Sequence, residues 1–95
     1  MSVKAVVTFR AHKGKGVALL AALTVPLEAT RGNSDCRDSG LFMGAQSPDE
    51  LVLLEEWVSV EAHRKHLEAL ESDGTMDKVN SLLAAEPEIV HYKKI

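Results

Sequence analysis

The sequence predicts an α+β fold of the ferredoxin-like type, in which two β-α-β units contribute to one antiparallel four-stranded sheet. Two patterns carry this prediction: apolar residues recur at every second position in four segments, and with helical spacing in the segments between them. The resulting order is strand, helix, strand, strand, helix, strand, with a further short helix before the last strand. The expected elements are residues 2–10, 16–29, 36–46, 50–58, 60–71, 75–85 and 88–95.

Length and composition favour a single domain over residues 1–95. Hydrophobic residues make up 45% of the chain and charged residues 26%, which argues against wholesale disorder. The net charge of -3 gives no support to a nucleic acid or an anionic membrane as a partner. No apolar run approaches the ~20 residues of a membrane span, and the alternating N-terminal segment does not resemble a signal peptide. The single cysteine, Cys36, fits a reducing cytosol, so we expect a cytoplasmic protein.

The first strand and the first helix are joined by a glycine-containing turn. One face of the strand carries the apolar residues Val3, Ala5, Val7 and Phe9. In the turn, Gly14 and Gly16 are flanked by lysines and could cradle a phosphate, but neither full glycine fingerprint is present, so we disfavour a phosphate site. The stripe of the helix expected to face the sheet is Val17, Leu20, Thr24 and Leu27, with Leu23 beside it. Pro26 is expected to kink or end this helix near Val25.

The second and third strands are expected to form an antiparallel hairpin around the turn at residues 47–49. Gly40 and Gly44 weaken the second strand. The third strand places one row of alternating residues on one face: Leu51, Leu53, Glu55 and Trp57. The other face carries Val52, Leu54, Glu56 and Val58. Because both rows are largely apolar, the strand should be covered on both sides.

The second helix is capped by Ser59 and has an inward stripe formed by Val60, His63, Leu67 and Leu70, with His66 on the same side. The short third helix should point Met76, Val79, Leu82 and Leu83 inward. Helices on one side of the sheet would leave its other face uncovered, and we expect that face to carry Val6, Thr8 and the Trp57 row. A homodimer in which two sheets pack face to face would bury it.

Several residues, taken together, resemble the antibiotic biosynthesis monooxygenase (ABM) family. They are Thr30-Arg31, Cys36, Glu55-x-Trp57, His66 nine positions after the tryptophan, Glu86-Pro87-Glu88-Ile89 and Tyr92. The resemblance covers essentially the whole chain and implies a dimeric α+β barrel. Members of the family include small oxygenases that act on anthrones and quinols without metal or flavin, others that degrade haem, and others that isomerise small signalling sugars.

The chain also departs from the family pattern. Asn33 stands where the pattern has an acid, Asp35 where it has a glycine, and Ser39 where it has an aromatic residue. No asparagine occurs between residues 2 and 10, which weakens the haem-degrading interpretation. The resemblance therefore implies a cofactor-independent monooxygenase of a small planar oxidisable substrate, such as a quinol or anthrone. A non-redox isomerase of a small carbonyl compound and a non-catalytic binding dimer remain alternatives.

The catalytic candidates are His66, as a base or proton shuttle, and Glu55, as the group that orients it. The alternative, which the usual roles of histidine favour slightly, is that His66 is a structural histidine. A buried Glu55 would need a partner, for which Arg31 and His66 are the natural choices.

Trp57 could stack on a planar substrate or belong to the core. Arg31, as an anion partner, and His63 and Phe42 are the further candidate substrate contacts, although Phe42 also suits simple packing. His63 and His66 could supply two metal ligands, but no Cys or third His lies near in sequence and Glu55 would be the only carboxylate on its face of the strand, so we disfavour a metal site. The resemblance to the ABM oxygenases implies that no cofactor is needed.

Overall fold

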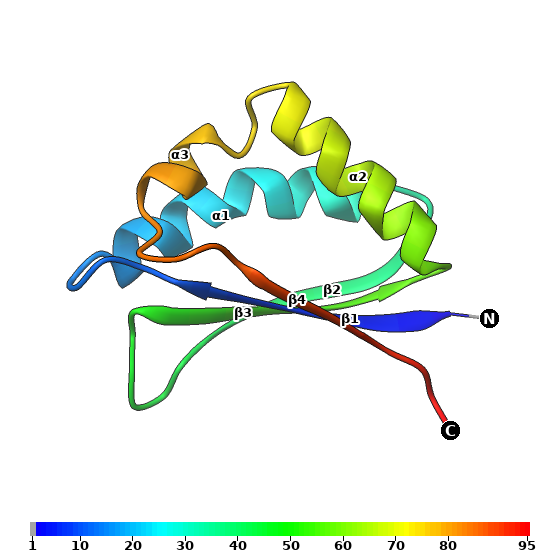
Figure 1. Ribbon diagram of the computed structural model, residues 1–95, viewed down its shortest axis with the longest axis horizontal. Helices are drawn as coiled ribbons and strands as arrows, with labels where there is room; N and C mark the ends of the chain where they lie inside the picture. The colour runs from blue at the N-terminus through cyan, green and yellow to red at the C-terminus, as the bar shows by residue number, and fades with distance from the viewer. Residues whose placement is uncertain (1) are drawn as a thin grey trace.

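The computed structural model describes residues 2–95. It contains the predicted ferredoxin-like fold: a four-stranded antiparallel sheet in the order β2-β3-β1-β4, with all three helices on one side of it (Figure 1). The elements are β1 (Val3–Arg10), α1 (Gly16–Arg31), β2 (Cys36–Met43), β3 (Glu50–Trp57), α2 (Val60–Ser72), α3 (Asp77–Ser81) and β4 (Glu88–Tyr92). None of the helices is long and apolar enough to cross a membrane.

The core lies between the sheet and the helices. The face of β1 that carries Val7 and Phe9 and the face of β3 that carries Leu51 and Leu53 are buried beneath α1, as the alternation predicts. The antiparallel register places Val7 opposite Leu53 and Phe9 opposite Leu51. Each residue pair therefore adds apolar area to one continuous layer, the main source of stability for a domain of this size.

Helix α1 differs from the prediction in its length and in its buried stripe. It does not end near Val25 but continues to Arg31, with Pro26 inside it. Leu23 and Leu27 are buried as predicted, whereas Val17 is 71% exposed. The other buried residues of the helix are Gly16, Leu19, Pro26 and Thr30. Proline costs one helical hydrogen bond, but packing of the residues on either side of it against the sheet keeps the helix continuous.

The turn between β1 and α1 carries an internal anion in place of a phosphate. The Asp49 carboxylate accepts hydrogen bonds from the Gly14 N–H (3.0 Å) and the Gly16 N–H (2.9 Å). It therefore caps the positive end of α1 from the β2–β3 turn. A side chain at Gly16 would lie 1.9 Å from the Pro48 carbonyl oxygen, so this contact requires glycine.

Three other elements, β2, α3 and β4, end several residues earlier than predicted. Strand β2 ends at Met43 because the hairpin closes there through the Gly44 N–H bonding to the Glu50 carbonyl. Helix α3 ends at Ser81 because the following segment returns to the sheet, where the Ala84 N–H donates to the Arg10 carbonyl. Strand β4 ends at Tyr92, where its pairing with β1 stops.

The two faces of the sheet differ sharply in how they are covered. The Trp57 row was expected on the uncovered face but lies on the helix side, where Trp57 is fully buried. The uncovered face (Figure 1) carries the opposite row of every strand. Its large apolar residues include Phe42, Leu54, Val90 and Tyr92, which are 54%, 39%, 42% and 53% exposed. The predicted homodimer requires an uncovered apolar face of this kind, which a second copy of the chain would cover.

Candidate functional site

The candidate site lies where β3 meets α2 on the helix side of the sheet. Glu55 and Trp57 share one face of β3 because they are two residues apart. Ser59 caps α2 by accepting a hydrogen bond from the Ala62 N–H (3.1 Å). The helix that begins there places His63 and His66, three residues apart, over the Trp57 indole, with both ring centroids 5.0 Å from it. The structure thus brings together four of the six residues proposed from sequence.

Glu55 is only 2% exposed and is held by neutral donors. One carboxylate oxygen accepts from the Ser39 hydroxyl (2.8 Å) and the other from the Trp57 indole N–H (3.0 Å). The expected partners, Arg31 and His66, do not bond to it. Its partner Ser39 faces it across the β2–β3 ladder, so the residue noted as a departure from the family pattern is the one that satisfies the buried carboxylate.

One row across the sheet explains the position of His63. Ser39, Glu55, Ala5 and His91 are neighbours in this row, on β2, β3, β1 and β4. The methyl side chain of Ala5 leaves space above it. The His63 imidazole occupies this space, with Nδ1 2.8 Å from His91 Nε2 and Nε2 3.6 Å from Glu55 Oε1. A chain of titratable groups therefore leads from buried Glu55, through His63, to half-buried His91.

The contacts of His63 determine its protonation. Burial, together with the neighbouring His91 and His66, lowers the pKa of His63 to about 4, so the ring is neutral at neutral pH. The approach to Glu55 is therefore not an ion pair, and at 3.6 Å it is too long for a good hydrogen bond. We assign the proton to Nε2, facing the carboxylate, with Nδ1 accepting from His91, because the other tautomer would aim a lone pair at Glu55. Among the described residues, His63 Nε2 has no hydrogen-bond partner.

His66 has a partner on each ring nitrogen. Its Nε2 lies 2.8 Å from the Thr30 hydroxyl oxygen, and its Nδ1 lies 3.2 Å from the Asn33 side-chain nitrogen. Since an amide NH2 only donates, Nδ1 accepts and Nε2–H donates to Thr30. Burial lowers the pKa of His66, while Glu55 and Asp73 act in the opposite direction. His66 is therefore a neutral imidazole whose basic nitrogen is covered by the Asn33 amide.

The Asn33 amide makes a direct test of this assignment possible. In Asn33→Asp, a carboxylate that only accepts should reverse the His66 tautomer and stabilise the imidazolium, so the pKa of His66 rises. The measurement is an NMR titration of the His66 ring. Ser34→Asp adds the same charge at the next, exposed residue and should leave His66 nearly unchanged. An unshifted His66 in Asn33→Asp, or an equal shift in Ser34→Asp, would contradict the contact.

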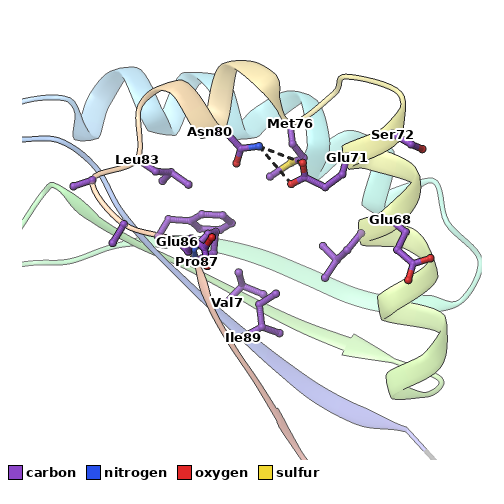
Figure 2. Close-up of a pocket in the computed structure, with 14 residues that line it drawn as sticks. Val7, Glu68, Glu71, Ser72, Met76, Asn80, Leu83, Glu86, Pro87 and Ile89 are labelled. Carbon is purple, nitrogen blue, oxygen red and sulfur yellow. Dashed lines mark hydrogen bonds between the residues drawn. The ribbon is translucent and has the colours of Figure 1, made fainter.

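Two adjacent spaces lie beside these side chains. The inner one is a void of about 30 Å³, the volume of about one water molecule, bounded by Thr30, Glu55, His63 and His66 together with apolar core residues. The outer one is a pocket of about 1000 Å³ between α2, α3 and the sheet (Figure 2). Both spaces are lined by Val7, Phe9, Leu67 and Met76. A ligand in the outer pocket would thus be separated from the histidines only by these four apolar side chains.

Two of the sequence-based candidates lie elsewhere. Phe42 is on the uncovered face of the sheet, opposite Val52, and is not a wall of either space. Arg31 is exposed, donates to the Ser39 carbonyl oxygen (3.3 Å) and borders a separate 280 Å³ pocket at the edge of β2. Cys36 borders the same pocket, and burial raises the pKa of its thiol, which disfavours a nucleophilic thiolate.

The sequence analysis did not propose Asn33, Ser39 or His91 as residues of the site. The alternating pattern placed His91 on the same side of its strand as Ile89, but gave no reason to pair it with His63. With the sheet order known, the row shared with Ala5 would have identified it. Within residues 2–95, no three His, Cys, Asp or Glu side chains group in a way that could hold a metal ion.

The burial of His63 predicts an acid-sensitive fold. Its pKa is lower in the folded chain (about 4) than the ordinary value of 6.5, so the unfolded chain binds a proton more readily. The contribution of His63 to stability is complete above pH 6.5 and is lost as the pH falls towards 4, at up to about 1.4 kcal/mol per pH unit. The lowered pKa values of His66 and His91 act in the same direction.

Urea denaturation at several pH values measures this effect. The free energy of unfolding should fall more steeply between pH 6.5 and 4 in the wild type than in His63→Gln, which has no titrating group at this position. His12→Gln, which removes an exposed histidine of the first turn, serves as the control and should keep the wild-type slope. Equal slopes in the wild type and His63→Gln would show that His63 does not titrate as a buried group.

The fold and the pocket define the class of this protein: a small α+β domain with a ferredoxin-like sheet and a histidine-lined cavity beneath its helices. The chain belongs to the ABM family, since the model of that family, antibiotic biosynthesis monooxygenase, matches residues 2–78. This confirms the resemblance deduced from the sequence. No curated protein sequence matches the chain significantly.

Solved structures share the fold over nearly the whole chain. A conserved protein from Methanosarcina mazei has a TM-score of 0.86 and 21% identity, covering 100% of this chain and 94% of its own. A putative antibiotic biosynthesis monooxygenase from Bordetella bronchiseptica has a TM-score of 0.85 and 15% identity, with coverages of 99% and 97%. Another from Nitrosomonas europaea has a TM-score of 0.86 and 18% identity, with coverages of 99% and 90%. At these identities the likeness concerns the fold alone.

Proposed function

We propose that this protein is a cofactor-independent monooxygenase of the ABM type, which oxidises a small planar substrate such as a quinol or an anthrone. The observation that carries the proposal is a neutral His66 beside the Trp57 indole, lining a small void that shares apolar walls with a pocket large enough for an organic molecule. Membership of the family supports the same reaction class.

In the proposed reaction His66 is the base. When the substrate displaces the Asn33 amide, the Nδ1 lone pair can remove a proton from an acidic C–H or O–H group. The resulting carbanion adds O2 and becomes a peroxide. For an anthrone, the peroxide then loses water, its CH2 group becomes C=O, and the proton held by His66 leaves with the departing oxygen. One oxygen atom enters the product and the other becomes water, so no external reductant is needed.

The roles of the neighbouring groups follow from their contacts. Trp57 is fully buried and borders neither space, so its part is to hold Glu55 through the indole N–H rather than to contact the substrate. Glu55, fixed by Ser39 and Trp57, would place a negative charge near His66. The apolar lining would exclude water from the carbanion. Phe42 and Arg31 have no part in this proposal, because neither borders the inner void or the outer pocket.

Oxygen dependence tests the proposal. Anthrone or a quinol is supplied with labelled O2, and the proposal requires consumption of one O2 per product, with one labelled atom in the anthraquinone formed from anthrone. Turnover of a small carbonyl compound without O2 would instead support the isomerase alternative. The binding-only alternative has its own support, since Glu55 and His66 are both fully bonded by protein groups. Saturable binding without turnover under air would favour it.

We also propose that two copies form a homodimer through their uncovered sheet faces. The support is the exposed apolar surface around Phe42, Leu54, Val90 and Tyr92, since contiguous apolar surface of this kind is unfavourable in water. Sedimentation at micromolar concentration should show one species of twice the chain mass, and a stable monomer would contradict the proposal. A cytoplasmic location, which the free thiol of Cys36 suits, remains a prediction.

A further inference from the structure

The outer pocket has an apolar interior and an acidic mouth. Val7 and Ile89 of the sheet form its floor, and Met76 lies on the side of α3 (Figure 2). Phe9, on the same face of β1 as Val7, also lines the pocket. At about 1000 Å³ it is at the upper end of the range usual for small-molecule sites. An apolar ring system would be sheltered from water in this space.

Three carboxylates stand at the mouth. Glu68 and Glu71 are three residues apart on α2 and therefore share one of its faces. Glu86, between α3 and β4, lies on the other side of the pocket (Figure 2). Glu71 is held in place by the Asn80 side-chain nitrogen, which lies 3.4 and 3.3 Å from its two oxygens. No lysine, arginine or histidine is among the described residues that line this pocket.

A second, independent observation points to a ligand here. The pocket shares Leu67 and Met76 with the adjoining inner void, which His63 lines. The Nε2 atom of this fully buried histidine has no hydrogen-bond partner among the described residues. Buried polar atoms without a partner are uncommon, and they are found where a ligand or water completes the site. An unsatisfied polar atom, which faces Glu55, thus lies in the wall of the void next to this pocket.

We propose that this pocket selects an apolar ring compound that carries an ammonium or another hydrogen-bond donor, and that it rejects carboxylates, phosphates and sulfates. The apolar body binds between α2, α3 and the sheet, and the donor lies among Glu68, Glu71 and Glu86. Three negative charges without a compensating cation attract a cation and repel an anion, and this effect weakens as salt screens it. The inference rests on the proposed function only in taking the bound compound as the substrate.

Three naphthalene probes of similar shape test the charge preference: naphthylmethylammonium, naphthylmethanol and naphthylacetate. Dissociation constants are measured by NMR titration under nitrogen at low ionic strength. The cation should bind about tenfold or more tightly than the anion, and the alcohol should have an intermediate affinity. Added salt should reduce the differences among the three dissociation constants. In the variant Glu68→Gln, Glu71→Gln, Glu86→Gln, the three constants should agree within about twofold.

A charge-matched control separates the mouth from the overall charge of the protein. The control variant Glu28→Gln, Asp35→Asn, Glu61→Gln removes three exposed carboxylates that do not border the pocket. The net charge of the protein therefore changes by the same amount as in the variant of the mouth. This control should keep the wild-type order of affinities. The proposal would be overturned if the wild type bound the anion as tightly as the cation or more tightly, or bound none of the probes. It would also be overturned if the variant without the three mouth carboxylates kept the wild-type differences in affinity, or if the control variant lost them to the same extent. Because no O2 is present, each result is independent of whether the protein is a monooxygenase.

Discussion

Gly16→Ala is expected to destabilise the protein by at least about 3 kcal/mol, which corresponds to a fall of roughly 12 °C or more in the thermal midpoint. The added Cβ would lie 1.9 Å from the Pro48 carbonyl oxygen and 2.6 Å from its carbonyl carbon. These are backbone atoms, so no side-chain rotation relieves the clash. Moving the 47–49 turn away would break the bonds from Gly14 and Gly16 to Asp49, and that from the Ala11 N–H to the Asp49 carbonyl.

Two other glycines provide matched controls. Gly14 has nothing within 4 Å of a Cβ but has a φ of +79°, so Gly14→Ala should cost about 1 to 2 kcal/mol from backbone strain alone. Gly32 has ordinary contacts of 3.6 Å and a φ of -80°, so Gly32→Ala should be near neutral or slightly stabilising. Chemical denaturation of the three variants measures their free energies of unfolding and so gives the order of their stabilities. A Gly16→Ala protein as stable as the Gly32→Ala protein would show that the turn can move at little cost.

His66→Gln is expected to lower kcat for the proposed oxidation by about 10² to 10⁴, the usual contribution of a positioned general base. Glutamine can still donate to Thr30 or accept from Asn33, so the surrounding hydrogen bonds persist in part and the fold should remain intact. It has no nitrogen that takes up a proton near neutral pH. The expected result is a large loss of O2 consumption with a nearly unchanged unfolding midpoint and nearly unchanged binding of a substrate analogue.

His12→Gln is the matched control for this loss, because His12 is exposed in the first turn and lies far along the chain from the site. It should keep wild-type turnover. If His66→Gln retains more than about half of the wild-type rate, His66 is not the base. If it loses stability and activity together, the histidine is structural. A loss of activity alone would leave the base assignment standing.

The fold followed from local patterns in the sequence. Alternation fixed the strand faces, so Glu55 and Trp57 had to lie together. Helical spacing fixed His63 and His66 on one side of α2. The bare sheet face followed from counting elements, since the chain has no segment left to cover it. Prediction failed for Pro26, where burial of the residues around it outweighed the local cost of proline in a helix.

The partners of the site residues were beyond prediction from local patterns. Ser39 contacts Glu55 across 16 positions and His91 contacts His63 across 28, while Asn33 and Thr30 reach His66 across 33 and 36. Each contact depends on strand register or on the path of a loop, and a shift of one residue in register would turn Ser39 to the opposite face. The arrangement of Arg31, expected beside Glu55 but bound to a β2 carbonyl, depends on the same features.

By itself, then, the sequence determined the order of the elements, which candidate residues share a side of the same strand or helix, and the family, because these properties depend on spacings of two to four residues and on short motifs. It did not determine which side of the sheet the helices cover. Only the tertiary structure decided that Asp49 caps α1, that His63 is buried between Glu55 and His91, that Asn33 covers His66 and that three carboxylates surround an apolar pocket. The physical reason is that these properties come from packing between distant segments, which sets burial, and burial in turn sets protonation and charge preference.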